Sequence, residues 1–581
     1  MNLRSPKLFG TSLFDKFFSY LDSLQPVDRV IFGTLLLVFL VATTYNFYVF
    51  ARGFLVEVPV SGGTLVEGTI GSPRFINPVL AITRADNDLV ALTHSGLLRL
   101  GEDGTLENDL AESITISEDG LVYNIIMHND RYFHDGVKVT TEDVAFTIGL
   151  VQKASLKSPL RGNWSGVTVE VINSQELNLV LENPYAPFRE NLTLGIMPKH
   201  IWQTLSDEEF PFSQHNVEPI GSGPYKISAI TRNSAGLASE YQLELADDYR
   251  PDGHIKNIAF RFYQNEEGVI SALKAGEITS TASLSERWLT ELDREKFNFT
   301  SEPLPRVFSI FFNQNRNPVL RDESARKALN LVIDREELIS RAVNGFGKPT
   351  NTPIPADWVD LESEEEPEKT DTERITEATQ VLSDGGWVQN QSGRWEKEID
   401  GASMPLVLTV RSANGVLFEK MASYLSETWQ SLGAEVTFEF YEQSDLVQTI
   451  IRPRDYQALL FGMDVGRSLD LYPFWHSGSR EDPGLNVSLY ANIAVDNLVT
   501  QMRTATSTEA RDETIRRFVT EIENEQPAIF LFTPSFEYVT EKNIIVAPMK
   551  KIQKPSERFS NVTDWYINQS GVWPIFVNND N

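Results

Sequence analysis

The sequence predicts a large mixed α/β protein that follows a single membrane-spanning helix. Three observations predict it: a length of 581 residues, an uncharged apolar run at residues 30–50, and strand-like and helix-like periodicities that alternate through the remainder. One hydrophobic core rarely grows beyond about 250–300 residues, so at least two domains are expected. The long returns between mixed segments favour a discontinuous, multi-lobed arrangement over independent domains in a row.

The apolar run at 30–50 is long enough to cross a bilayer core, which needs about 20 residues of helix. Only Arg52 is basic in the twenty residues after the run, whereas four basic residues precede it: Arg4, Lys7, Lys16 and Arg29. The positive-inside rule therefore places residues 1–29 in the cytoplasm and the bulk of the chain outside it, as a single-pass protein of the cell membrane. A cleaved signal peptide is the alternative, but its apolar region is normally shorter and ends at small residues, unlike FARGF at 50–54.

Strand patterns come first in the remainder of the chain. Residues 62–70 are expected to form a strand. Residues 167–172 and 176–181 alternate around Asn173 and Ser174, which is typical of a hairpin. Residues 121–128 also alternate, with four apolar side chains on one face: Leu121, Tyr123, Ile125 and Met127.

Helices are indicated by caps and by apolar spacing. The residues TTED at 140–143 predict a helix start, followed by an inward face of Val144, Ile148 and Val151. Residues 321–343 are expected to form one long helix or two, with Leu329, Val332 and Ile333 inward. The acid-rich residues 357–374 predict a solvated loop before a helix at 375–382. A further helix at 419–432 and a strand at 435–441 complete the set.

Composition and motifs exclude several classes of protein. There is no cysteine, which excludes disulfides, thiolate metal sites, a cysteine nucleophile and a lipidated N-terminal cysteine. The net charge of −30 argues against a nucleic-acid partner, because a protein that tracks phosphates needs a basic face. The chain has no G-x-S-x-G elbow, no H-E-x-x-H and no phosphate-binding loop, and His128 and His134 lack metal-site spacing. We therefore expect no catalytic residue, no bound metal and no cofactor.

Several motifs occur in a characteristic order. Residues 110–147 contain LAES, an alternating strand, FHDG and the TEDV helix start. They are followed by NPYAPFRENLTLGIMPKH at 183–200, PIGSGPYK at 219–226, ALKAGEI at 272–278, NPVLRDESARKALNLVIDREE at 317–337 and NVSLYANIAVD at 486–496. In this order and spacing the chain resembles the extracytoplasmic solute-binding proteins of peptide and nickel ABC importers, of the dipeptide- and oligopeptide-binding type. The resemblance covers roughly residues 60–545.

The resemblance implies a bilobal α/β fold like that of periplasmic binding proteins, type II, of the large class with an extra domain. Ligand would be trapped by hinge closure between the lobes. The implied division is lobe I at 60–100 and 220–315, the extra domain at 101–219, lobe II at 316–539, and the lobe I return and tail at 540–581. The implied partners are a peptide ligand and an ABC permease, and we expect a monomer.

The resemblance also implies where ligand binds. It places a carboxylate for the ligand ammonium within residues 461–475, with Asp470 as the first candidate and Asp464 as the second. The residues expected to line side-chain pockets are Phe461, Tyr472 and Trp475, beside Gly462, which precedes Met463 where the family usually has Trp. The candidates for an anionic ligand end are Arg467 and Arg74, and Asn77 lies on the same cleft-facing loop as Arg74.

Other interpretations stay open for these residues and for the chain. Either aspartate could be a cap or turn residue, the aromatic side chains could be core residues, and Arg467 could lie on the surface. Within the same fold, the solute could be a sugar or a nickel chelate. The chain could also act as a sensory or interaction receptor without transport, because fold alone does not decide function.

Overall fold

The structure is a computed structural model that describes residues 20, 23, 25–52, 56–246, 253–361, 369–505 and 507–572. The described residues fall into two compact units. The first lies within Met1–Val60 and Asn568–Asn581, and the second is Ser61–Ile567.

The first unit contains one long helix and a two-stranded ribbon. Helix α2 (Pro26–Arg52) includes an apolar span, Pro26–Phe47, that is long enough to cross a membrane and is unburied. It extends beyond both ends of the run predicted at 30–50. Strand β1 (Val56–Val60) pairs antiparallel with β23 (Asn568–Val572), so segments from both ends of the described chain meet in one ribbon. Most of the predicted cytoplasmic segment at 1–29 lies outside the described residues.

The second unit is built on a twelve-stranded sheet in which β20-β19-β21-β14-β22-β12-β2-β11-β10-β9 are neighbours in that order, and β13 and β15 pair with β22. Its strands are β2 (Thr64–Ile70), β9 (Tyr225–Arg232), β10 (Ala238–Leu245), β11 (Asn257–Tyr263), β12 (Ser280–Thr281), β13 (Phe297–Pro303), β14 (Arg306–Phe312), β15 (Gly347–Pro349), β19 (Val407–Ala413), β20 (Glu435–Tyr441), β21 (Ala458–Asp464) and β22 (Ala528–Glu541).

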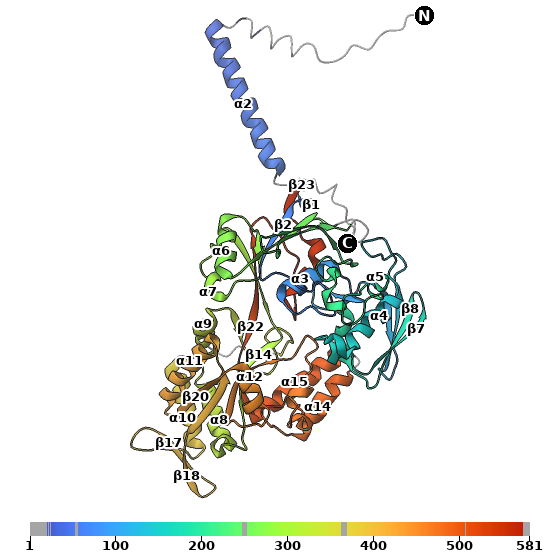
Figure 1. Cartoon of the computed structure of the whole chain (residues 1–581). Coiled ribbons are helices and arrows are strands. Elements are labelled where there is room, and N and C mark those ends of the chain that lie inside the picture. Colours follow the sequence, from blue (N-terminus) through green and yellow to red (C-terminus); the bar gives the residue numbers. More distant parts are fainter. Residues whose placement is uncertain are drawn as a thin grey trace, which may run out of the picture. The chain divides into compact units, whose positions relative to one another are not determined.

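Strand β22 runs from one lobe of the second unit into the other (Figure 1) and contributes buried side chains to both. Ile529 and Phe532, near its start, are buried with four helices in what we call the second lobe: α8 (Glu323–Leu331), α9 (Arg335–Val343), α10 (Asp371–Asp384) and α11 (Val416–Leu432). Phe536 and Tyr538, near its end, are buried with β2, β10, β11 and helix α3 (Arg84–Thr93), in what we call the first lobe. Helices α6 (Glu266–Ala275) and α7 (Glu286–Leu289) pack on the same lobe around Val539.

A four-stranded domain with its own core lies in the sequence between α3 and β9 of the first lobe. Its sheet has the order β5-β6-β8-β7, and its strands are β5 (Ala111–Ile116), β6 (Val122–Met127), β7 (Val167–Asn173) and β8 (Glu176–Leu181). The predicted hairpin is therefore confirmed. Helix α4 (Thr141–Gln152) starts where predicted, because the Asp143 carboxylate accepts a hydrogen bond of 2.9 Å from the backbone N–H of Thr140.

The second-lobe helices confirm most of the predicted pattern. Residues 321–343 form two helices, and 419–432 lies inside a longer one; the set is α8 (Glu323–Leu331), α9 (Arg335–Val343), α10 (Asp371–Asp384), α11 (Val416–Leu432), α13 (Tyr472–Trp475), α14 (Ile493–Thr504) and α15 (Thr508–Glu525). Helix α10 begins before residue 375, because Thr370 caps it. The prediction of a solvated loop at 357–374 is wrong at Trp358, which is buried and donates a hydrogen bond to the Pro303 carbonyl. Residues 362–368 lie outside the described part of the chain.

Candidate ligand-binding site

A tight turn after β21 positions three of the predicted site residues. In this turn the backbone N–H of Val465 donates a hydrogen bond of 2.9 Å to the carbonyl of Pro305, which lies in the connection between β13 and β14. Gly466 and Leu469 adopt left-handed backbone angles, with φ of 63° and 47°, which let the chain reverse before α13. As a result the turn lines one wall of a cavity of about 720 Å³ with Asp464, Arg467 and Asp470.

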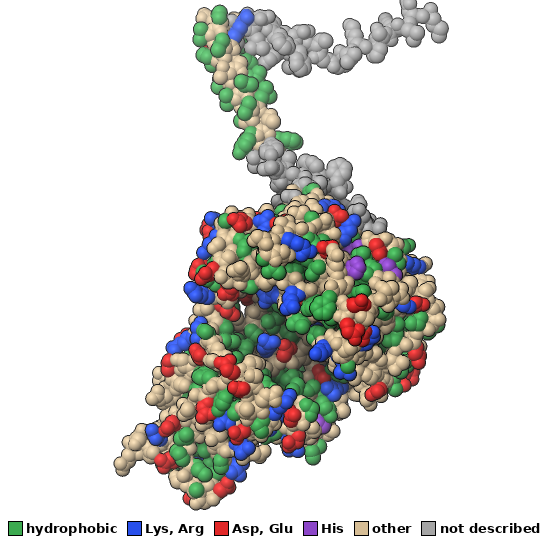
Figure 2. Space-filling view, in the orientation of Figure 1, with side chains coloured by type: hydrophobic (Ala, Val, Ile, Leu, Met, Phe, Trp, Pro, Cys, Tyr) green, Lys and Arg blue, Asp and Glu red, His purple; other side chains and the backbone are tan. Residues whose placement is uncertain are grey.

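The four-stranded domain supplies the opposite wall of this cavity. Tyr185 and Glu190 lie there, in and beside the 3-10 segment η3 (Ala186–Thr193), and Gln553 joins them from the C-terminal part of the first lobe. In the space-filling view the second unit is hollowed between the region of α3 and that of α12 (Gln443–Asp445) and α15, and hydrophobic and basic side chains gather in the hollow (Figure 2).

Asp470 is largely buried and already paired within the protein. Its side chain is 11% exposed, and its carboxylate accepts two hydrogen bonds from Arg503 on α14, 2.8 Å from Nε and 2.6 Å from Nη2. The Tyr185 hydroxyl donates a third, at 3.3 Å. Burial and the neighbouring Asp470 raise the pKa of Tyr185 to about 12, so the hydroxyl keeps its proton at neutral pH. A ligand ammonium would share this carboxylate with Arg503.

The guanidinium of Arg467 bridges three parts of the second unit. Its side chain is 5% exposed and pairs with Glu190 of the four-stranded domain at 2.5 Å and with Glu557 of η9 (Pro555–Asp564). Its Nε donates to the Lys551 carbonyl at 3.0 Å. Burial raises the pKa of Glu190, and the charge of Arg467 opposes that shift. Arg467, which was predicted to bind a ligand carboxylate, is therefore already paired with two carboxylates of the protein itself.

The remaining candidates in residues 461–475 lie beside this cavity or in the core. Asp464 is half-exposed and pairs with Arg306 at 3.1 Å. Gly462 lies opposite Phe308 in the β14–β21 pair, where a Cβ would come within 3.2 Å of the Phe308 ring. Phe461 and Tyr472 pack against the second-lobe core, and the Tyr472 ring lies 4.1 Å from the Arg503 guanidinium. Trp475 is 0% exposed inside that core.

The two candidates on the first lobe lie apart from this cavity. Asn77 is 0% exposed, and its side chain bonds to the Asn216 side chain and the Val79 backbone. Arg74 is exposed and lies near the Phe75 ring. The structure thus brings together Asp464, Arg467 and Asp470 around one cavity, and the other six candidates are not among its lining residues.

Sequence reasoning missed the partners that hold these groups. Arg503 and Glu557 carry no motif of their own. Tyr185 and Glu190 both lie inside the stretch NPYAPFRENLTLGIMPKH, which carries the resemblance but was not predicted as part of the site. That stretch is the one signal that could have pointed to these two residues.

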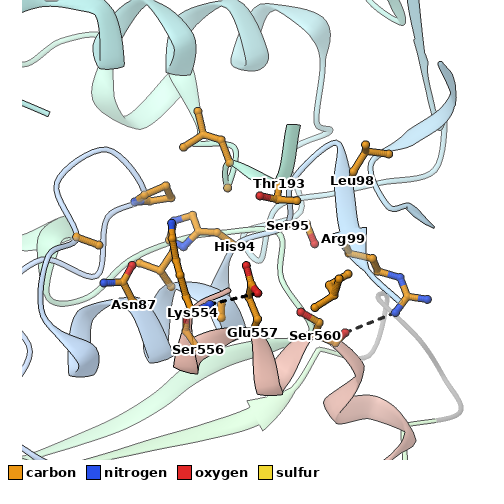
Figure 3. Close-up of a pocket in the computed structure, with 18 of the residues that line it drawn as sticks. Asn87, His94, Ser95, Leu98, Arg99, Thr193, Lys554, Ser556, Glu557 and Ser560 are labelled. Atoms are coloured by element: carbon orange, nitrogen blue, oxygen red, sulfur yellow. Dashed lines mark hydrogen bonds between the residues drawn. The ribbon is translucent and has the colours of Figure 1, made fainter. Parts of the chain in front are cut away.

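A second cavity, of about 390 Å³, adjoins the first and lies between α3, η3 and η9 (Figure 3). Its wall includes small polar side chains such as Ser95, Thr193 and Ser560, together with Glu557. His94 also lines it. Burial lowers the pKa of His94 to about 3, so its imidazole is neutral, and it hydrogen-bonds to the Thr93 hydroxyl. Within the described ranges, no three His, Asp or Glu side chains are grouped so that they could hold a metal ion.

Comparison with known proteins identifies the family. The model for bacterial extracellular solute-binding proteins, family 5 (middle region), matches residues 105–483. The chain belongs to this family. Among curated family 5 relatives, the oligopeptide-binding protein AppA of Bacillus subtilis is 27% identical over 504 residues, which cover 84% of this chain and 89% of AppA. The oligopeptide-binding protein OppA of the same organism is 22% identical over 496 residues, 81% of this chain and 88% of OppA.

Several solved structures share the fold of this chain. AppA of Bacillus subtilis in complex with a nonapeptide matches with a TM-score of 0.60 at 24% identity, covering 88% of this chain and all of AppA. The periplasmic murein tripeptide-binding protein MppA, in its unliganded open form, matches with a TM-score of 0.74 at 17% identity, covering 88% of this chain and 98% of MppA. NikZ of Campylobacter jejuni, in complex with Ni(L-His), matches at 0.60 and 22%, covering 87% of this chain and 99% of NikZ. The fold is therefore that of bilobal solute-binding proteins.

Proposed function

We propose that this protein is the membrane-anchored, extracytoplasmic substrate-binding component of an ABC importer and that it captures peptides between its lobes for delivery to the permease. The observation that carries the proposal is the match to an oligopeptide-binding protein across 84% of this chain and 89% of the relative. The protein would act by binding alone, with no chemical step. Main-chain hydrogen bonds would hold the peptide backbone without reading its sequence, and closure of the lobes would exclude water.

We propose that the hinge lies where two segments run from one lobe to the other: the connection between β13 and β14, and the middle of β22. Leu304, between β13 and β14, donates a hydrogen bond of 2.9 Å to the Pro534 carbonyl in the middle of β22. Phe308 is buried in the second lobe and Tyr538 in the first, which supports boundaries close to 304 and 534, in place of the 316 and 539 expected from the sequence. In this division the four-stranded domain would be the extra domain of the large class, type II.

The proposed function is tested by identifying the ligand that purifies with the protein. The full chain is purified in detergent, native mass spectrometry measures the ligand-bound fraction, and denaturation releases the ligand for sequencing. A mixture of short peptides is the expected result. A sugar or a nickel chelate would keep the fold and overturn the peptide class. An empty protein that a peptide library does not stabilise against heat would favour a sensory or interaction role.

Delivery to a permease is tested separately in cells. A strain that lacks this chain should take up a labelled peptide more slowly, and the full chain should restore uptake. Unchanged uptake in a strain with no second peptide-binding protein would contradict the importer role, even if the purified protein binds peptides.

A further inference from the structure

The two cavities of the second unit meet at one buried ion-paired cluster. They share four lining residues: Asn163, Glu190, Asn191 and Gln553. Arg467 lines the larger cavity, Glu557 lines the smaller one, and Glu190 lines both. Because Arg467 pairs with both glutamates, its guanidinium stands at the boundary between the two spaces.

We propose that Arg467, Glu190 and Glu557 form a partition that sets the length of the peptide this protein accepts. With the ion pairs made, the larger cavity ends at Arg467. With Arg467 displaced, the smaller cavity becomes an extension that receives the end of a longer peptide. This inference rests on the proposed function, because it assumes that a peptide occupies the larger cavity.

Opening the partition requires a second arrangement in which Glu190 keeps a cation. Removing a partner from a buried carboxylate is costly, so Glu190 needs another cation if Arg467 leaves. Arg511 on α15 is the candidate: it is half-buried, and its charge interacts favourably with Asp512, Glu190 and Asp470. Its Nη2 is buried without a hydrogen-bond partner in the part of the chain that the structure describes. Opening the partition would therefore exchange one arginine for another at Glu190, whereas Glu557 would keep only the backbone N–H donors of Gln553 and Lys554. Two such discrete arrangements are typical of a packed site that switches.

The wall of the smaller cavity suits the end of a peptide backbone. Its polar groups are mostly uncharged and are able both to donate and to accept, as in Ser95, Asn163, Thr193 and Ser560. Arg99 also lines it, and among the described residues its buried Nε has no hydrogen-bond partner. Such groups would pair with peptide N–H and C=O groups without selecting a side chain.

The test is a length series measured on the full chain in detergent. Uncharged peptides that grow by one residue at a time are titrated by calorimetry to find the length at which the affinity of the wild-type protein falls. Arg467→Met removes the partition, so the first excluded peptide should bind about tenfold more tightly, a gain of about 1.4 kcal/mol. Arg511→Met removes the alternative partner of Glu190, so the same first excluded peptide, which has to open the partition, should bind still more weakly than it does to the wild-type protein. These two arginine variants are expected to change the affinity for that peptide in opposite directions.

Controls separate this effect from loss of fold. Arg374→Met removes a partly buried pair with Asp334 inside the second lobe, 2.6 Å, and should leave the length limit unchanged. Glu190→Gln weakens the partition and keeps its shape, and so replaces Arg467→Met if that variant does not fold. An unchanged limit in a folded partition variant would overturn the inference. Equal loss of peptides of all lengths would also overturn it, because Arg467 would then be a ligand contact. If the wild-type protein binds no peptide, the proposed function fails, and the inference fails with it.

Discussion

The carboxylate of Asp470, the first candidate to bind a ligand ammonium, already accepts three hydrogen bonds from the protein. If this carboxylate also binds the ammonium, Asp470→Asn should weaken the binding of free-amine peptides about tenfold more than the binding of their N-acetylated forms, because an amide cannot pair with the charge. Calorimetry on the two forms of one peptide measures the difference. Asp400→Asn, at the exposed pair with Arg321 away from the cavity, is the matched control and should change both forms little and equally. Equal loss of both forms in Asp470→Asn would remove the amine role.

The carboxyl group of Glu537 makes the stability of the folded protein depend on pH. It lies on β22 opposite Ser301, whose hydroxyl donates to it at 2.5 Å, and burial raises its pKa from 4.5 to about 7, with help from the nearby charge of Glu286. Between these values the folded protein binds a proton that the unfolded chain has lost. The stabilisation is therefore complete below pH 4.5 and is lost as the pH rises to about 7.

The corresponding variant is Glu537→Gln, which cannot titrate. Across that pH window the wild-type protein should lose up to about 3 kcal/mol of unfolding free energy that the variant keeps, at 1.36 kcal/mol per pH unit. Urea titrations of the full chain at pH 5 and pH 8 measure the difference, with Glu295→Gln, at an exposed site, as the control for the change in net charge. Parallel pH profiles for wild type and Glu537→Gln would contradict the prediction.

At the scale of elements, a buried ion cluster joins four segments of the first lobe. The Arg558 guanidinium of η9 is 0% exposed and pairs with Glu67 of β2 at 2.9 Å and Asp88 of α3 at 2.7 Å. The Tyr538 hydroxyl of β22 donates to Glu67 at 3.0 Å. Strand β22, which runs between the lobes, is therefore held in the first lobe by a buried ion-paired cluster.

Removing this arginine should therefore detach η9 from β2 and α3. Arg558→Met leaves two buried carboxylates without their cation, and it should lower the unfolding free energy by about 3–5 kcal/mol. The exposed pair between Arg341 and Glu337 on α9 is the matched comparison, where Arg341→Met should cost less than about 1 kcal/mol. Urea titration measures both variants. Equal losses would mean that the buried cluster does not hold these elements together.

Elements set by local chemistry could be predicted from the sequence, and contacts between distant segments could not. Strand 435–441 and the start of α4 follow from alternation and from one cap, so the predicted limits match β20 and Thr141. Arg467 and Glu190 are 277 residues apart, and Asp470 and Tyr185 are 285 apart. Nothing local marks which of 81 acidic residues meets a given arginine. The turn at 464–470 could therefore be singled out from the sequence, whereas its internal pairing could not.

At the scale of the whole molecule, helix α2 is either a retained membrane anchor or part of a cleaved signal peptide. A helix of 27 residues, at 1.5 Å per residue, is about 40 Å long, more than the roughly 30 Å of a bilayer core. A cleaved signal peptide would remove this helix from the mature protein. An intact anchor would leave a membrane-bound chain of the full 65.5 kDa, so intact-mass measurement on protein from membranes separates the two.

Cutting the chain between α2 and β1 tests the anchor directly. A protease site inserted at residues 53–55 keeps β1 with β23, because the ribbon begins at Val56. Since α2 is the one span of sufficient length and apolarity in the described chain, cleavage should move all of the product from the membrane to the soluble fraction. The same chain without protease should stay in the membrane after alkaline washing, and the released product should keep the peptide affinity of the uncut protein. Product that stays in the membrane after cutting would indicate a second attachment, and product that is free before cutting would indicate signal cleavage.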